Sequence, residues 1–311
     1  MTSNSPCSRI RLGTRASALA RWQADWVGER LRRLGVEVVL VPILTTGDHH
    51  SEGSIGAIGD QGVFTKELQR ALLDERIDLA VHSLKDLPTD EVPGLCLAAV
   101  PERGSVGDAF VSRKYPSLAR LPPQSVVGTG SLRRRAQLLH RRPDLVFQDV
   151  RGNVDTRLKK LDEGRYDAII LAQAGLERLG LTARVTERLP FETVMPAVGQ
   201  GALGLETRTS DPITRPAVER LGHPDTHAAV LAERSMLAAL LGGCLAPIAA
   251  LGRVEGGTLT LSGRVVHPNG MTRLDATESS TPKEAVALGR RVAEALIAQG
   301  AADLIQAARR G

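Results

Sequence analysis

The sequence predicts two α/β domains followed by a smaller α+β domain. Two stretches of the 311-residue chain, residues 10–81 and 108–189, alternate apolar strand segments with amphipathic helical segments. Residues 251–279 instead alternate apolar and polar residues around Gly-Gly and Asn-Gly turns, a pattern typical of antiparallel hairpins. A chain of this length can bury several cores. No internal sequence repeat accompanies the two α/β stretches.

The first α/β stretch opens with a strand and a helix. Gly35 closes that helix, and the apolar run after it predicts a strand buried on both faces. A polar, glycine-rich loop after this strand is too long for a tight connection and indicates a functional or mobile segment. The expected elements are strands at residues 10–13, 36–44 and 77–81 and helices at residues 17–34 and 64–74.

The second stretch and the C-terminal part carry clear helix-capping signals. Ser131 and Asn153 each precede a helical pattern, and Thr281 to Glu284 form a capping box with proline at the first helical position. Gly300 ends the long helix that follows. The expected elements of the second stretch are strands at residues 125–127, 145–150 and 166–172 and helices at residues 131–140, 154–164 and 174–180.

The charge balance predicts an anionic partner. The net charge is +5, and 34 arginines stand against 6 lysines. Codon bias can produce this ratio, but the planar arginine side chain also binds carboxylates and phosphates through two parallel hydrogen bonds. Nucleic acid and a small molecule with several carboxylates are both compatible with this charge.

Cysteine usage and the absence of long apolar runs indicate a reducing cytoplasm. The three cysteines are widely spaced and odd in number, so neither a disulfide framework nor a thiolate metal site is expected. The first residues lack an apolar signal core, and no run approaches membrane-spanning length. His223 and His227 have a zinc-helix spacing, but Pro224 and Asp225 make this segment a helix start, and we expect no metal.

Cys244 has an unusual setting. A structural cysteine normally sits inside a periodic apolar element, whereas Cys244 follows Gly242 and Gly243, which indicate the end of a helix, and precedes Pro247. This setting points to a role for the thiol itself.

The segment from Gly128 to Arg142 predicts an anion site at a helix start. Arg133 and Arg134 fall in the first helical turn, where the helix dipole disfavours cations by roughly 0.3–1 kcal/mol. An anionic ligand would offset this cost, and free backbone N–H groups there also attract anions. The alternative, a solvated basic helix face, suits Arg141 and Arg142 better.

A second site is predicted where the strand before His82 ends. Ligands bind outside the carboxyl ends of strands in open α/β sheets, and Ser83, Lys85 and Asp86 follow directly. A hydrolase triad is disfavoured, because adjacent strand residues point to opposite faces and the nucleophile-elbow motif is missing. Asp86 as a helix or turn cap, and Lys85 with Asp86 as a surface ion pair, remain open alternatives.

Seven motifs together resemble one known family. In order they are RLGTRASALARWQA, HSLKDLP, GTGSLRRRAQL, RGNVDTRL, AGLERLG, PAVGQGA and GGCLAPI, and the chain is similar to the porphobilinogen deaminases, or hydroxymethylbilane synthases. The resemblance spans essentially the whole chain and thins only beyond the segment around Cys244.

The resemblance implies a transferase of tetrapyrrole and heme biosynthesis. Such an enzyme condenses four porphobilinogen molecules head to tail, with loss of ammonia, onto a dipyrromethane cofactor held by a cysteine thioether, and water then releases the linear hydroxymethylbilane. The matching cysteine is Cys244, and the matching catalytic aspartate is Asp86. Each pyrrole bears two carboxylates, which gives the arginine excess a purpose. The resemblance also implies a cytoplasmic monomer that binds neither nucleic acid nor a membrane.

The fold implied by the resemblance has two α/β domains like those of periplasmic binding proteins and a small α+β domain. The implied divisions are residues 1–103 with 196–219, residues 104–195, and residues 220–311, the last carrying the cofactor cysteine. The implied cofactor- and substrate-binding residues are Arg15, Ser17, Phe64, Ser83, Lys85, Thr129, Ser131, Arg133, Arg134, Arg151, Arg157, Arg178 and Gln200.

One segment departs from the family pattern, and two rival functions remain. The loop before Phe64 offers Asp60 and Gln61 where the family commonly offers basic residues, which puts loop contacts to the substrate in doubt. A non-enzymatic solute-binding module for a polycarboxylate would share the two-domain architecture. A nucleic-acid binder would suit the basic charge but lacks aromatic residues near the basic helix.

Overall fold

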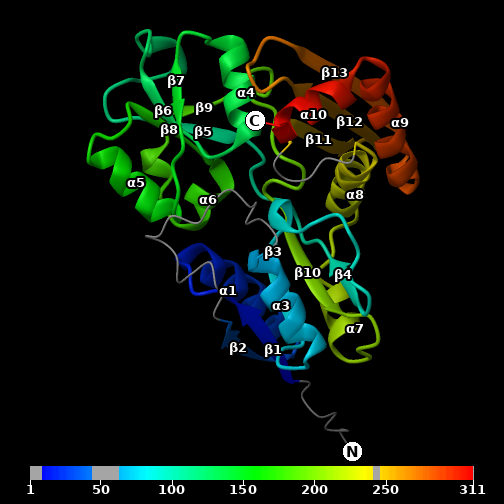
Figure 1. Cartoon of the computed structure of the whole chain (residues 1–311). Coiled ribbons are helices and arrows are strands. Elements are labelled where there is room, and N and C mark those ends of the chain that lie inside the picture. Colours follow the sequence, from blue (N-terminus) through cyan, green and yellow to red (C-terminus); the bar gives the residue numbers. More distant parts are fainter. Residues whose placement is uncertain (1–8, 44–62, 241–245, 311) are drawn as a thin grey trace, which may run out of the picture. The chain divides into compact units, whose positions relative to one another are not determined.

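The described residues form three β-sheets, two of five strands and one of three (Figure 1). The computed structural model describes residues 9–43, 63–240 and 246–310. The two larger sheets are mixed and carry helices, whereas the smallest is antiparallel. The predicted fold class, two α/β parts with a smaller α+β part, is therefore confirmed.

The first sheet has the strand order β2-β1-β3-β10-β4. Strands β2, β1 and β3 are parallel, and β10, from a distant part of the chain, inserts antiparallel between β3 and β4. Helices α1 and α3 pack on this sheet through apolar faces. The elements are β1 (Arg9–Thr14), α1 (Ala18–Arg33), β2 (Glu37–Pro42), α3 (Val63–Leu73), β3 (Leu79–Ser83), the 3-10 turn η2 (Leu84–Asp86), β4 (Leu95–Ala99), β10 (Leu203–Arg208) and α7 (Thr214–Glu219).

The second sheet repeats this arrangement without a matching sequence repeat. Its order is β7-β6-β8-β5-β9, with β7, β6 and β8 parallel and β5 inserted antiparallel between β8 and β9. The elements are β5 (Asp108–Val111), η3 (Leu118–Arg120), β6 (Val126–Gly128), α4 (Leu132–Arg141), β7 (Val146–Gln148), α5 (Val154–Asp162), β8 (Ala168–Ala172), α6 (Gln173–Arg178), η4 (Thr182–Arg184) and β9 (Glu187–Arg188).

The third sheet is the predicted hairpin part, in the order β11-β12-β13. Helices α8, α9 and α10 share an apolar core with it. Gly270 in the second turn has φ +79°, and a Cβ there would lie 2.6 Å from the backbone nitrogen of His140, so this hairpin needs glycine where it meets α4. The elements are α8 (Pro224–Ala239), β11 (Ile248–Glu255), β12 (Thr258–Val266), β13 (Arg273–Ser280), η5 (Pro282–Glu284), α9 (Ala285–Ala298) and α10 (Ala301–Arg310).

The predicted helix caps are confirmed. The side chains of Ser131 and Asn153 accept hydrogen bonds from backbone N–H groups in the first turns of α4 and α5. Thr281 and Glu284 form the capping box, which encloses η5 immediately before α9. Gly300 has φ +98° between α9 and α10.

The strand at residues 36–44 was expected to be buried on both faces, and that expectation is wrong. The strand is β2, which forms an edge of the first sheet, and its residues are mostly half-buried or exposed. An apolar, β-branched run therefore does not distinguish a central strand from an edge strand.

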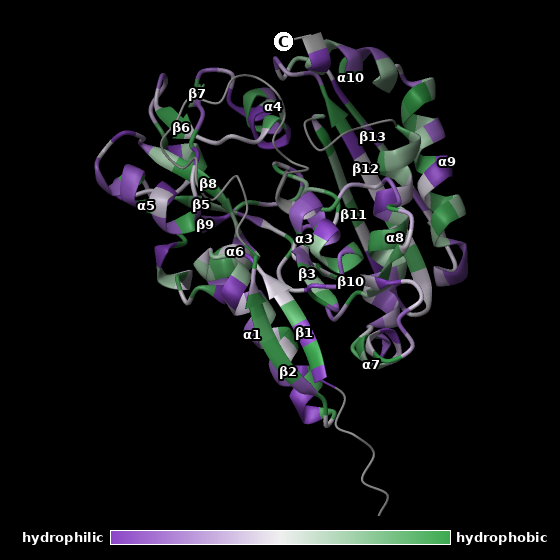
Figure 2. Cartoon of the chain, turned by 60° about the horizontal axis from the view of Figure 1, so that its bottom comes forward, coloured by the Kyte–Doolittle hydropathy of each residue, from purple (hydrophilic) through white to green (hydrophobic). Residues whose placement is uncertain are grey.

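Figure 2 shows the hydropathy of each residue along the helices and strands. The helices α5 and α9 are banded in hydrophilic and hydrophobic colours, as expected of helices with one face on a sheet. In the described part of the chain no helix is both long enough and apolar enough to span a membrane.

The contacts of the chain divide it into two compact units. One comprises Met1–Arg103 with Ala202–His227, and the other Gly104–Gly201 with Ala228–Gly311. The chain passes between the units after Arg103 and after Gly201. The two segments of the second unit at these points are hydrogen-bonded to each other, since the Gly104 N–H donates to the Gly201 carbonyl at 3.2 Å. A Cβ at Gly201, where φ is +85°, would lie 2.7 Å or less from two carbonyl oxygens. The finer division into three domains stays a prediction.

A buried carboxylate, Asp78, stabilises the first sheet at the amino end of β3. Asp78 accepts hydrogen bonds from the Arg11 side chain at 2.7 and 2.9 Å and from Arg208 at 2.8 Å. Burial alone would raise the pKa of Asp78, but these arginines outweigh it and lower the pKa to about 2. The lowered pKa corresponds to a stabilisation on the order of 2 kcal/mol at neutral pH.

We predict that Asp78→Asn lowers the free energy of unfolding at neutral pH and that this difference shrinks in acid. Because the folded-state pKa is depressed, the stabilisation is complete above the unfolded value of 3.8 and is lost as the pH falls towards 2. Urea unfolding of both proteins across this range measures the difference. Asp25→Asn, at an exposed position on α1, is the control and should be nearly neutral. A difference that is the same at pH values above and below this window would contradict the prediction.

Candidate functional site

The carboxyl end of β3 presents the predicted catalytic aspartate. Asp86 closes the turn η2, its side chain is exposed, and no ion pair or hydrogen bond engages its carboxylate in the described residues. Ser83 ends the strand, and its hydroxyl accepts a hydrogen bond from the buried Gln23 amide of α1 at 2.9 Å. Lys85, between them, is half-buried. Asp86 is thus a carboxylate open to a ligand on an anchored turn.

His82 is held on the opposite face of β3. Its Nε2 lies 2.9 Å from a carboxylate oxygen of Glu206 on β10, and the other Glu206 oxygen accepts from the Gln69 amide of α3 at 3.0 Å. All three side chains are buried. His82 and Ser83 therefore engage opposite faces of the sheet, as alternation along a strand requires, and they do not form a hydrolase pair.

The segment after β1 lies beside β3, since the two strands are parallel neighbours. Arg15 is half-buried directly after β1, and Ser17 is the N-cap of α1, accepting from the Ala20 N–H at 3.3 Å. Two predicted contributors of the first unit, Arg15 and Ser17, thus follow one strand, and three more, Ser83, Lys85 and Asp86, follow its neighbour.

In the second unit the turn from β6 to α4 is ordered by its own hydroxyl groups. Thr129 is buried, and its hydroxyl accepts from the Ser131 N–H at 3.2 Å. The Ser131 hydroxyl in turn accepts from the Arg134 N–H at 3.4 Å. This local geometry places Arg133 and Arg134 in the first turn of α4, as the sequence predicts.

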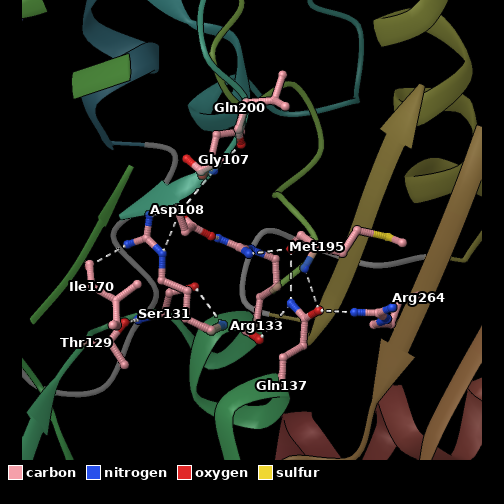
Figure 3. Close-up of polar contacts among 12 residues, drawn as sticks. Gly107, Asp108, Thr129, Ser131, Arg133, Gln137, Ile170, Met195, Gln200 and Arg264 are labelled. Atoms are coloured by element: carbon pink, nitrogen blue, oxygen red, sulfur yellow. Dashed lines mark hydrogen bonds and ion pairs between the residues drawn. The ribbon is translucent and has the colours of Figure 1, made fainter. Parts of the chain in front are cut away.

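Arg133 and Arg134 are both paired with a buried aspartate, Asp108. Figure 3 shows Asp108 and Arg133 in this cluster. Asp108 of β5 has no exposed surface; one of its oxygens accepts from Arg133 at 2.8 Å and the other from Arg134 at 2.6 and 3.0 Å. Arg133 also donates to the Met195 carbonyl at 2.6 Å, and Arg134 to the Ile170 carbonyl at 3.1 Å.

The explanation offered for these two arginines from the sequence is therefore incomplete. An internal carboxylate, Asp108, offsets part of their charge at the helix start. Burial alone would raise the pKa of Asp108, but the two arginine charges outweigh it and hold the pKa well below its usual range. Two guanidinium groups against one carboxylate still leave one excess positive charge in this cluster. A role for Arg133 and Arg134 in binding a ligand stays a prediction.

The remaining predicted binding residues of the second unit differ in exposure. Gln200 is buried and its amide donates to Asp108 at 3.1 Å and to the Val106 carbonyl at 2.7 Å. Arg178 is half-buried and donates to the Gly201 carbonyl at 2.7 Å, and burial lowers its pKa.

Arg151 and Arg157 lie nearer the surface, around the start of α5. Arg151 is exposed, with a nitrogen 3.8 Å from a carboxylate oxygen of Asp149. Arg157 is half-buried and donates to the Gly152 carbonyl at 2.8 Å. Arg151 is therefore the predicted binding arginine with the most freedom to reach an anion.

The expectation of a solvated basic face at the end of α4 holds for one residue of the two. Arg141 is exposed. Arg142 is not solvated: its guanidinium donates to both oxygens of Asp144 and to the carbonyls of Leu118 and Leu121, each within 2.8 Å. Arg142 thus secures the loop around η3, a contact that helical spacing could not reveal.

Several predicted residues lie outside the described part of the chain. These are Cys244, Asp60 and Gln61, together with the side chain of Phe64. Of the other cysteines, Cys96 is described; it is half-buried on β4, with its sulfur 3.6 Å from the Thr207 hydroxyl.

Sequence reasoning missed the residues that hold these side chains in place. Asp108, Gln23 and Gln137 are buried polar groups, each bound to a predicted site residue or its backbone. In the sequence, each of these residues is recognisable only as a polar residue within an apolar pattern. This pattern does not show which residue it binds.

Comparison with known proteins gives matches over most of the chain. A family model described as "Porphobilinogen deaminase, dipyromethane cofactor binding domain" matches residues 10–216, and one described as "Porphobilinogen deaminase, C-terminal domain" matches residues 227–298. A curated porphobilinogen deaminase of Desulforudis audaxviator is 50% identical over 304 residues, 97% of this chain and 98% of the relative. One from Pelobacter propionicus is 46% identical over 303 residues, 97% of each chain.

Among solved structures, a putative methionine-binding lipoprotein from Bacillus subtilis is similar with a TM-score of 0.44 and 14% identity. The similarity covers 70% of this chain and 91% of that one.

We predict that Asp108→Asn destabilises the protein by about 3–5 kcal/mol, because it leaves two buried guanidinium groups without a full counter-charge. Urea unfolding measures the loss. Asp149→Asn removes an exposed carboxylate near Arg151 and should cost at most about 1 kcal/mol. Equal stability losses in the two variants would show that the Asp108 cluster contributes no more than a surface ion pair.

Proposed function

The chain belongs to the porphobilinogen deaminase family, and on this premise we propose that it condenses four porphobilinogen molecules head to tail onto a bound dipyrromethane primer. Ammonia leaves at each addition, and water finally releases the linear hydroxymethylbilane. The observation that carries the proposal is the 50% identity to a porphobilinogen deaminase over 97% of the chain. The reaction makes the protein a transferase of tetrapyrrole biosynthesis.

We propose Asp86 as the catalytic residue. Loss of ammonia from porphobilinogen leaves an electron-poor methylene-pyrrole cation. A fixed carboxylate beside the pyrrole N–H groups stabilises this developing charge and can move a proton. The exposed, unengaged carboxylate of Asp86 on its anchored turn supports this role.

The described residues fit a primer that carries several carboxylates. The Asp108 cluster keeps one excess positive charge, and the buried Nε of Arg133 has no hydrogen-bond partner in the described part of the chain. Arg151 adds an exposed guanidinium. Residues proposed to hold the primer and substrate carboxylates are Arg15, Ser17, Ser83, Lys85, Thr129, Ser131, Arg133, Arg134, Arg151, Arg157, Arg178 and Gln200, with Phe64 as a stacking partner for a pyrrole ring.

When bound, the dipyrromethane supplies the terminal pyrrole carbon to which the first substrate is joined. We propose that the thiol of Cys244 holds it as a thioether, since a soft nucleophile suits the same kind of electrophile that the substrate forms. A cytoplasmic location and a monomeric state are further parts of the proposal.

The alternatives predict no covalent pyrrole. A solute-binding module would bind a polycarboxylate reversibly, and a nucleic-acid binder would have no reason to carry a pyrrole at all. Formation of a covalent adduct therefore separates the deaminase from both.

We predict that intact-protein mass spectrometry finds a species heavier than the polypeptide by two porphobilinogen units less the ammonia lost in coupling them. Peptide mapping should place the adduct at Cys244, and added substrate should give steps of one pyrrole unit. Cys244→Ala should have the bare polypeptide mass and be inactive, whereas Cys7→Ala and Cys96→Ala keep the adduct. No added mass at Cys244 in protein made with porphobilinogen available would refute the attachment site.

We predict that Asp86→Asn lowers kcat by at least about 100-fold, the usual contribution of a general acid–base group. The side chain is exposed and unpaired within the described chain, so the melting temperature should stay close to that of the wild type. Ammonia release from porphobilinogen measures the rate. Near-normal turnover in the purified variant would remove Asp86 from its role.

We predict that Arg151→Leu raises the KM for porphobilinogen or slows primer loading roughly tenfold, as expected for loss of a charge-assisted contact. Arg141→Leu is the matched control, because both side chains are exposed and neither change disturbs a core. The same assay applied to both gives the comparison. Effects of equal size would mean that Arg151 does not contact the ligand.

A further inference from the structure

Gln137 lies at the centre of a buried polar network in the second unit (Figure 3). Its side-chain oxygen accepts from the Met195 N–H at 2.9 Å and from Arg264 at 3.0 Å. Its amide nitrogen donates to the Met195 carbonyl at 3.1 Å and to the Arg133 carbonyl at 3.3 Å. One amide thus joins α4, the segment at Met195 and strand β12.

Arg264 and the Met195 N–H together determine which way this amide faces, because both donate to its oxygen. A guanidinium can only donate hydrogen bonds, so it requires the oxygen of Gln137 on its side. The reversed amide would place its NH₂ group against the guanidinium and its oxygen against two carbonyls. In the buried network such mismatches are costly, and Arg264 therefore strengthens the hold on Gln137 in this one orientation.

Gln137 in turn shares an acceptor with Arg133. The Met195 carbonyl receives both the Gln137 amide and an Arg133 nitrogen, the latter at 2.6 Å. The position of this carbonyl helps to set the Arg133 guanidinium, whose other contact is Asp108. A change at Gln137 can therefore shift the Arg133 side chain through the Met195 carbonyl that both side chains bind.

Arg264 is itself firmly held. Only 4% of its surface is exposed, its Nε donates to Asp275 of β13 at 2.6 Å, and its Nη1 also donates to the carbonyls of Phe191 and Glu192 at 3.2 and 3.1 Å. Arg264 is thus a rigid point on the third sheet.

We infer that Arg264 is a positioning residue for Arg133, acting through Gln137 and the Met195 carbonyl. The third sheet, which carries Arg264, then sets the geometry in which Arg133 binds the carboxylates of the primer and substrate. This inference rests on the proposed function, because it assumes that Arg133 binds those carboxylates.

The structure offers a matched control in Arg273. Arg273 pairs with the same Asp275 and donates to the same Glu192 carbonyl, but it has no contact with Gln137 among the described residues. Arg264→Met and Arg273→Met therefore both remove a partner of Asp275, and only the first removes a hydrogen bond to Gln137.

The test uses full-length protein produced without porphobilinogen and then supplied with known concentrations of it. Intact-mass measurement after one fixed, short incubation gives the concentration at which half of the protein carries the added pyrroles, and a thermal melt of each variant reports folding. Arg264→Met should raise the half-loading concentration roughly tenfold, equivalent to the loss of one charge-assisted hydrogen bond. Arg273→Met should leave it within about twofold of the wild type.

A double-mutant cycle tests the route. If Arg264 acts through Gln137, the double variant Arg264→Met with Gln137→Met should be no worse in loading than the more impaired single variant. Additive effects, or wild-type loading in a folded Arg264→Met protein, would overturn the inference. If Arg264→Met does not fold, Gln137→Met alone carries the test, and wild-type loading by it would overturn the inference equally. Failure of the wild-type protein to gain any mass would instead contradict the proposed function.

Discussion

A single buried carboxylate, Asp108, organises the second unit. Two guanidinium groups can occupy the interior there only because Asp108 faces both. Removing one member of this ion-pair cluster would leave a buried charge without a partner or contact with water. Its antiparallel strand β5 lies between β8 and β9, so the carboxylate is placed by the strand order of the sheet. Asp108 accepts hydrogen bonds from the side chains of Arg133, Arg134 and Gln200.

In the first unit a neutral amide, Gln23, and a carboxylate, Glu206, hold in place the strand end that carries candidate site residues. The end of β3 is held from one face by Gln23 on Ser83 and from the other by Glu206 on His82. The turn that carries Asp86 is therefore fixed at its base while the carboxylate stays open. In both α/β sheets the proposed ligand-binding residues cluster after carboxyl ends of the parallel strands, the usual position of sites in open sheets. Arg15 follows β1, Ser83 ends β3, Thr129 follows β6, and Arg151 follows β7.

Much of this arrangement can be predicted from the sequence where the determining contacts are local. The caps at Ser131 and Asn153 bind N–H groups three residues away, and both appear as expected. The ordered motifs likewise identify the family and, with it, the candidate residues.

Contacts between distant segments could not be predicted in this way. Asp108 lies 25 residues before Arg133, and Arg264 lies 127 residues after Gln137. A lone polar residue in an apolar strand does not identify its partner, and the pairing of Arg133 with Asp108 could therefore not be predicted. The edge position of β2 was missed for a related reason, because its composition does not report its neighbours.

The most direct test of this account is the charge state of Asp108 before any ligand binds. Its side-chain carboxyl carbon, labelled with 13C and assigned by comparison with Asp108→Asn, can be followed by NMR from about pH 7 to about pH 3 in the primer-free Cys244→Ala protein. The account predicts that the resonance does not titrate in this range, because Arg133 and Arg134 hold the carboxylate ionised. Titration near the ordinary aspartate value of 3.8 would contradict it, because it would show that the two arginines do not hold Asp108 ionised.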